Sequence, residues 1–208
     1  MLKIIGNYFL GIFLYTLVII LLADFGRILL KYVFHASWIH SRTAFTVAGA
    51  ICALLILLLS ACGIFHAKYI KTTSYDVIIN KTIPERTSMK VVLLADTHFG
   101  YNAGVLHARE LVRKINKQKP DLVCIAGDIF DNEYDAIRNP EKLEKTLRGI
   151  KSTYGVYACW GNHDLNEEIL AGFTFKHKDG DLSNIKDPRM KKFLEDSNIH
   201  ILEDESVL

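Results

Sequence analysis

A strong excess of charge of either sign is missing from this 208-residue sequence, which has 25 lysine and arginine residues against 23 aspartate and glutamate residues. Residues 1–67 carry four basic side chains and one acidic side chain, so their net charge is +3 and that of the remainder is −1. Proteins that bind the phosphate backbone of nucleic acids need a concentrated basic surface. The charge balance therefore argues against nucleic acid as a primary partner.

Cysteine is also scarce, and its four positions, Cys52, Cys62, Cys124 and Cys159, show neither metal-site spacing nor the pattern of a small disulfide scaffold. We interpret them as buried free thiols. The sequence contains no internal repeat and no low-complexity tract.

Charged side chains are absent altogether from two apolar stretches, residues 4–23 and 43–67. About 20 residues of helix cross a hydrocarbon core of about 30 Å, so each stretch is long enough to span a membrane. We predict a membrane anchor over residues 1–71, with spans at about residues 4–23 and 44–67. A cleaved leader is the alternative, but no small-x-small cleavage site follows the first stretch.

The segment between the two stretches, residues 24–42, mixes charged with aromatic side chains. This composition is typical of an interfacial amphipathic segment and equally of an ordinary hairpin loop. Two spans place both flanks on one side of the membrane, and basic residues lie at both ends of the spans, so the positive-inside rule does not select an orientation. We predict a multi-pass protein of the cell membrane, with the side of the downstream domain left open.

Beyond the anchor, residues 72–208 alternate between strand and helix patterns, with strands at residues 90–95, 122–126 and 155–160 and helices at residues 104–117 and 140–150. The strands are apolar throughout, as strands buried on both faces of a parallel sheet are. This order predicts a mainly parallel α/β sheet with right-handed crossovers. We also expect a half-exposed strand at residues 75–79, a short helix at 188–196 and polar segments at 80–88 and 176–187.

Each of the three predicted strands ends in a polar block: Asp-x-His at 96–98, Gly-Asp-x-x-Asp at 127–131 and Gly-Asn-His-Asp at 161–164. The carboxyl ends of parallel strands meet at one edge of the sheet. The side chains predicted to converge there are Asp96, His98, Asp128, Asn162 and His163. Carboxylate, imidazole and amide groups together suit Mn, Fe or Zn. Gly127 and Gly161 let the backbone turn sharply and approach a ligand closely.

These three blocks resemble the first half of the calcineurin-like metallophosphoesterase signature. Together with the preceding spans they resemble its membrane-associated bacterial branch, the YkuE/YaeI-like phosphodiesterases. The resemblance covers residues 72–208. It implies a transmembrane helical hairpin followed by the first half of an αββα sandwich with a mainly parallel sheet.

The resemblance further implies two divalent metal ions, Mn, Fe or Zn. Asp96 and His98 would bind the first metal. Asp128 would bridge the two metals, and Asn162 would bind the second metal and the substrate phosphate. Two cations about 3.5–4 Å apart neutralise phosphate charge and lower the pKa of bound water.

The last block supplies the acid–base group by the same resemblance. His163 would donate a proton to the leaving oxygen or stabilise the transition state, and Asp164 would orient His163 and raise its basicity. Asp131 would shape the loop or support the ligands, and a direct role is equally open.

The implied function is a membrane-anchored, metal-dependent phosphoesterase that hydrolyses phosphodiester or pyrophosphate bonds by a two-metal mechanism. Its partners would be the lipid bilayer and a phosphoester substrate. An anchored site makes a lipid-linked substrate plausible, and the resemblance implies UDP-diacylglucosamine as the specific candidate.

The sequence departs from the family in one respect. The family completes its site with a later histidine and a Gly-His-x-His block, and this sequence contains no Gly-His-x-His. We therefore expect residues 72–208 to be the N-terminal part of a C-terminally truncated domain that binds metal weakly and hydrolyses phosphodiesters poorly. The alternative function is an inactive or non-catalytic membrane module.

Overall fold

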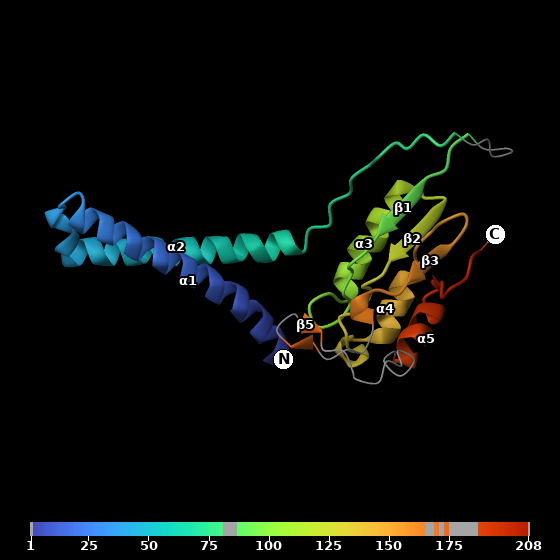
Figure 1. Cartoon of the computed structure of the whole chain (residues 1–208). Coiled ribbons are helices and arrows are strands. Elements are labelled where there is room, and N and C mark those ends of the chain that lie inside the picture. The colour runs from blue at the N-terminus through green and yellow to red at the C-terminus, as the bar shows by residue number, and fades with distance from the viewer. Residues whose placement is uncertain (1, 81–86, 165–168, 171–172, 175–186, 208) are drawn as a thin grey trace. The chain divides into compact units, whose positions relative to one another are not determined.

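The structure, a computed structural model, describes the chain except for residues 1, 81–86, 165–168, 171–172, 175–186 and 208 (Figure 1). The predicted polar segments at residues 80–88 and 176–187 lie mostly outside the described residues. The chain divides into two compact units, residues 1–69 and 70–208. The boundary between the two units lies two residues before the one that we predict between the anchor and the α/β domain, after residue 71.

The first unit consists of two long helices and a short turn: α1 (Leu2–Tyr32), the 3-10 helix η1 (Ser37–His40) and α2 (Arg42–Ala67). By length and composition, Tyr8–Tyr32 and Arg42–Ala67 are each able to cross a membrane. The helix α1 continues past residue 23, where we expected the first span to end. Charged residues limit the apolar stretch, but they do not break a helix.

The second unit contains a four-stranded parallel sheet in the order β1-β2-β3-β6, so the predicted α/β class is confirmed. Its strands are β1 (Val91–Leu94), β2 (Leu122–Ala126), β3 (Val156–Cys159) and β6 (His200–Ile201). The connecting helices are α3 (Val105–Gln118), α4 (Pro140–Leu147) and α5 (Pro188–Asp196). The remaining described elements are η2 (Tyr134–Ala136), η3 (Asn162–Asp164) and the antiparallel pair β4 (Ile169–Leu170) and β5 (Phe173–Thr174).

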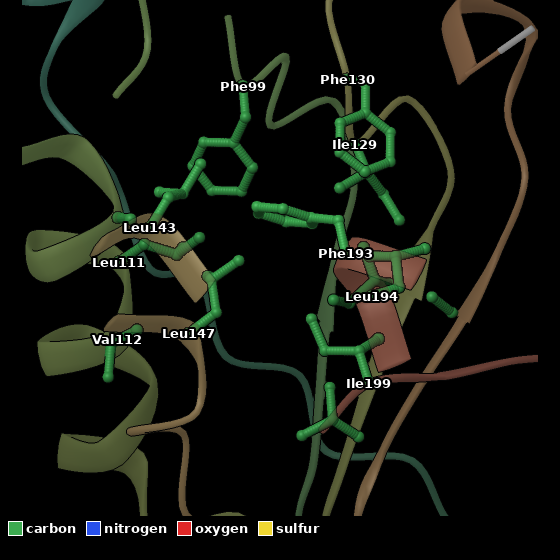
Figure 2. Close-up of a cluster of buried hydrophobic side chains, with 14 of the residues drawn as sticks. Phe99, Leu111, Val112, Ile129, Phe130, Leu143, Leu147, Phe193, Leu194 and Ile199 are labelled. Carbon is green, nitrogen blue, oxygen red and sulfur yellow. The ribbon is translucent and has the colours of Figure 1, made fainter. Parts of the chain in front are cut away.

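The core lies between the sheet and the helices α3, α4 and α5, and α4 contacts both of the other helices. The helices contribute buried leucine, valine and phenylalanine side chains at helical spacing, as amphipathic helices do. In Figure 2 these side chains meet those of the loops that follow the strands. The rings of Phe130 and Phe193, for example, pack edge to face with centroids 5.5 Å apart. The core therefore reaches the sheet edge at which the polar blocks begin.

One face of the sheet differs from the expectation of strands buried on both faces. In β1, Val92 and Leu94 pack against the core, whereas Val91 and Leu93 are 48% and 71% exposed. The strand expected at residues 75–79 is absent: these residues have no regular secondary structure and pair with no strand of the described chain, and their apolar side chains are exposed. A strand forms only where a neighbouring strand pairs with its backbone N–H and C=O groups. The alternation of apolar and polar side chains was therefore not sufficient to predict a strand here.

A charged cluster fixes the start of α5 and gives a testable pH dependence. The carboxylate of Asp187 caps the helix by accepting the backbone N–H of Arg189 at 2.9 Å. The Arg189 guanidinium donates to Asp187 and to Asp135. The hydrogen bond from Arg189 holds the pKa of the Asp187 carboxyl below its ordinary value.

We expect Asp187→Asn, which keeps a good cap, to lower the melting temperature slightly at neutral pH. Since the pKa of Asp187 is lower in the folded state, its stabilising effect is complete above the unfolded-state pKa of about 3.9. That effect is lost as the pH falls through the folded-state pKa. The difference in melting temperature between the two proteins should therefore vanish in strong acid, and a constant difference from pH 7 to pH 2 would contradict this account.

Candidate metal centre

The three polar blocks lie side by side because hydrogen bonding continues beyond the ends of the strands. The backbone N–H of Asp96 donates to the carbonyl of Gly127 at 3.2 Å, and that of His98 donates to the carbonyl of Asp128 at 3.0 Å. The β3 end is tied in by the backbone N–H of His163, which donates to Oδ1 of Asp128 at 2.9 Å. Residues far apart in the sequence thus converge at the carboxyl edge of the sheet, as the strand order predicts.

The backbone adopts an unusual conformation at three of the predicted ligands. Asp96, His98 and Asp128 have positive φ values of 55°, 42° and 51°. Such conformations cost free energy in residues other than glycine, and they gather at functional sites. The chain therefore turns sharply at each of these three positions, directly beyond the ends of β1 and β2.

Two groups of ligand atoms are close enough to hold cations. In the first, atoms of Asp96, His98 and Asp128 all lie within 4.8 Å of one another. Nε2 of His98 is 4.0 Å from Oδ1 of Asp96. Ligand bonds of about 2.0–2.2 Å place donors around one cation up to about 4.4 Å apart. If the ligand atoms of this group moved slightly closer together, they could all bind one divalent metal ion.

The second group consists of His98, Asp131 and His163, again within 4.8 Å of one another. The two imidazole rings meet edge to face with centroids 4.8 Å apart. For Asp131 we left a structural role and a direct role open. The structure places its carboxylate close to the two imidazoles.

Asn162 and Asp164 occupy the two ends of η3, and their surroundings differ sharply. Asn162 is exposed, whereas Asp164 is fully buried. The two carboxylate oxygens of Asp164 accept the backbone N–H groups of Phe130 at 2.7 Å and Gly161 at 2.8 Å. Burial raises the pKa of Asp164, while these hydrogen bonds oppose the shift. Asp164 thus joins the β2 loop to the β3 loop through the backbone.

The contact to the imidazole of His163 that we expected from Asp164 comes from another residue. Oδ1 of Asn132 lies 2.5 Å from Nδ1 of His163. Asn132 directly follows the Gly-Asp-x-x-Asp block, but it is 31 positions from His163. Its polar side chain after the block was the one available signal in the sequence.

The two predicted glycines serve the approach of the strand ends to each other. Gly127 has a φ of +78°, and a Cβ there would lie 2.7 Å from Cα of Gly161. A Cβ on Gly161 would overlap the backbone nitrogen and carboxylate of Asp128. Both positions therefore require glycine so that Asp128 can sit between the two loops.

Comparison with known proteins agrees with this geometry. The profile of the calcineurin-like phosphoesterase family matches residues 89–202. A bovine protein named transmembrane protein with metallophosphoesterase domain is 30% identical over 116 residues, which are 55% of this chain and 26% of that protein. The uncharacterized metallophosphoesterase YkuE of Bacillus subtilis is 29% identical over 107 residues, 49% of this chain and 37% of that protein.

A third relative is the UDP-2,3-diacylglucosamine pyrophosphatase LpxG of Chlamydia trachomatis, 26% identical over 90 residues, which are 41% of this chain and 27% of that protein. The chain thus matches about a quarter to a little over a third of the length of these three relatives. No solved structure matches it. Because the family profile covers more than half of the chain, the chain belongs to the calcineurin-like phosphoesterase family, whose members hydrolyse phosphoesters and normally bind divalent metals.

Proposed function

We propose that this protein is a membrane-anchored phosphoesterase that hydrolyses phosphodiester or pyrophosphate bonds. The observation that carries the proposal is the group formed by Asp96, His98 and Asp128, whose ligand atoms lie within 4.8 Å of one another at the carboxyl edge of the sheet. Family membership and the two helices long enough to cross a membrane agree with it.

The donor set fits divalent cations of the Mn, Fe or Zn type, because it combines carboxylate oxygens with imidazole nitrogen. Asp96 and His98 would hold the first cation, Asp128 would bridge to the second, and Asn162 would bind the second cation and the substrate phosphate. Two such cations, when bound, neutralise the charge of the phosphate and lower the pKa of the attacking water.

The protein groups around these ligands have separate tasks. Oδ1 of Asp128 accepts a backbone N–H, which fixes the orientation of that carboxylate. The His163 imidazole, next to His98, would deliver a proton to the leaving oxygen. Asp164 would act indirectly, by locking the loops that carry Asp128 and His163.

A lipid-linked pyrophosphate is the substrate class we propose. Phosphoesters linked to lipids are presented at the bilayer surface, where an anchored enzyme would meet them. The relative named as a UDP-2,3-diacylglucosamine pyrophosphatase supports this class, and UDP-diacylglucosamine is the specific candidate.

The test compares the wild-type chain with Asp96→Ala in detergent micelles, with Mn²⁺, Fe²⁺ or Zn²⁺ added in excess. Substrates are a chromogenic phosphodiester and UDP-diacylglucosamine. We expect slow, metal-dependent hydrolysis by the wild type and at least a tenfold lower rate for the variant, because a ligand should matter no less than the groups that support ligands. Equal rates for the two proteins would contradict the proposal and favour the non-catalytic alternative.

A further inference from the structure

The side chain and the backbone of Asn132 both contact His163. Oδ1 of Asn132 lies 2.5 Å from Nδ1 of the imidazole. The backbone N–H of Asn132 donates to the carbonyl oxygen of His163 at 3.1 Å. One residue from the β2 loop therefore holds both the ring and the main chain of a residue from the β3 loop.

The backbone conformation of Asn132 allows this contact. Its φ is 63°, in the left-handed region that asparagine tolerates better than most residues. The neighbouring backbone is fixed on both sides: the N–H of Asp131 donates to the carbonyl of Phe99, and the N–H of Glu133 donates to the carbonyl of Asp131. The Asn132 side chain is thus presented from a firmly held turn.

Two of the three acidic residues nearby accept hydrogen bonds from the backbone instead of from the His163 ring. Both carboxylate oxygens of Asp164 accept hydrogen bonds from backbone N–H groups. Oδ1 of Asp128 accepts the backbone N–H of His163. Asp131 places a carboxylate oxygen within 4.8 Å of a ring nitrogen of His163. The hydrogen-bond partner of Nδ1, however, is the amide oxygen of Asn132, which can only accept.

We propose that Asn132 is a positioning residue that fixes the tautomer of His163. An amide oxygen can only accept a hydrogen bond, so the neutral imidazole must carry its proton on Nδ1. Nε2 is then the nitrogen left to bind and deliver a proton. This inference rests on the proposed function for its catalytic meaning, but the tautomer itself does not depend on hydrolysis.

The proton balance of hydrolysis fits this arrangement. Water forms a new P–O bond and gives up one proton, while the P–O bond to the leaving group breaks and its oxygen takes one proton. The proton given up by the water would pass to bulk solvent. The proton taken by the leaving oxygen would come from Nε2 of His163, which would first take up a proton from bulk solvent, because the neutral Nδ1–H ring carries none on Nε2. Nδ1 keeps its proton throughout, in the hydrogen bond to Oδ1 of Asn132. The ring therefore does not have to rotate between turnovers.

Three variants separate the side chain from the backbone. Asn132→Gly removes the amide but keeps the left-handed conformation and the backbone N–H. Asn132→Asp restores an accepting oxygen at the same place. Asn139→Gly is the matched control, because Asn139 is exposed, has a φ of 56° and makes no side-chain capping hydrogen bond.

The first measurement is ¹⁵N NMR of the histidine rings in the full, metal-free chain in micelles, at a pH well above the ordinary imidazole pKa of about 6.5. Loss of the signal in His163→Gln assigns it. We expect the Nδ1–H tautomer in the wild type, in Asn132→Asp and in Asn139→Gly. Asn132→Gly should shift toward the Nε2–H form that free imidazole prefers. An Nε2–H wild type, or an unchanged tautomer in Asn132→Gly, would overturn the proposal.

The second measurement is steady-state hydrolysis by the same proteins. We expect kcat of Asn132→Gly to fall about tenfold, in the range of supporting partners of active-site histidines, with KM unchanged and kcat restored in Asn132→Asp. A fall in Asn139→Gly of the same size would show a general effect of the substitution and count against Asn132. Absence of hydrolysis in every protein would contradict the proposed function, whereas the NMR result would still decide the role of Asn132.

Discussion

Replacing Asp128 by asparagine is expected to lower the affinity of the chain for Mn²⁺ by at least about a hundredfold. Asp128 belongs to the group with Asp96 and His98, and its carboxylate is the proposed bridge between two cations. Asparagine keeps the size of the side chain and can still accept the backbone N–H of His163, so the loss is chiefly one of charge. Removal of mere supporting partners already costs 10–100-fold in metal affinity.

Isothermal titration of the full chain in micelles measures this effect. The matched control is Asp196→Asn on α5, where the carboxylate pairs with Lys192 at 2.9 Å on the surface. We expect the control to bind Mn²⁺ as the wild type does. Equal affinities for wild type and Asp128→Asn would remove Asp128 from the metal centre.

Replacing Gly161 by alanine is expected to destabilise the second unit by about 3 kcal/mol, at the upper end of the usual cost of overpacking. The new Cβ would overlap the backbone nitrogen of Asp128 and lie 2.8 Å from its Cγ. The backbone of Gly161 cannot easily move away from Asp128, because it also packs closely against Gly127. The β2 and β3 loops must separate, and the ligand of one loop then loses its support from the other.

Urea unfolding measures the free-energy change, followed by the fluorescence of Trp160 in a Trp38→Phe background. Gly104→Ala is the control, because a Cβ there meets no heavy atom within 4 Å. Gly104 is the N-cap of α3, where alanine is less favourable, so we expect only the smaller loss of stability that a poorer cap causes. If Gly161→Ala unfolds at the same urea concentration as this control, the close approach of the two loops does not limit stability.

Much of the second unit follows from its sequence. The helix predicted at residues 104–117 spans Val105–Gln118 in the structure, and the strand predicted at 122–126 has the same limits. These elements combine clear hydrophobic periodicity with strong end signals such as Pro120. The convergence of the polar blocks follows as well, because parallel strands leave one geometry for their ends.

The remaining features depend on contacts that a periodic pattern does not encode. The pairing of Asn132 with His163 is made between two loops, and its distance in the sequence gives no periodic signal. The exposed side of β1 could not be recognised either, since Val91 and Leu93 are as apolar as their partly buried neighbours in the strand. Whether such residues are covered depends on what else packs against the sheet.

The strand order has a consequence for how this protein is made. β1, β2 and β3 stand next to one another in the sheet in the order in which the ribosome synthesises them, and β6 then adds beside β3. In this sheet each emerging strand finds its neighbour already synthesised. Short waits between pairing strands favour fast folding and limit aggregation during translation. The ligand-bearing edge would thus be assembled stepwise from Asp96 onward, while later residues are still being added.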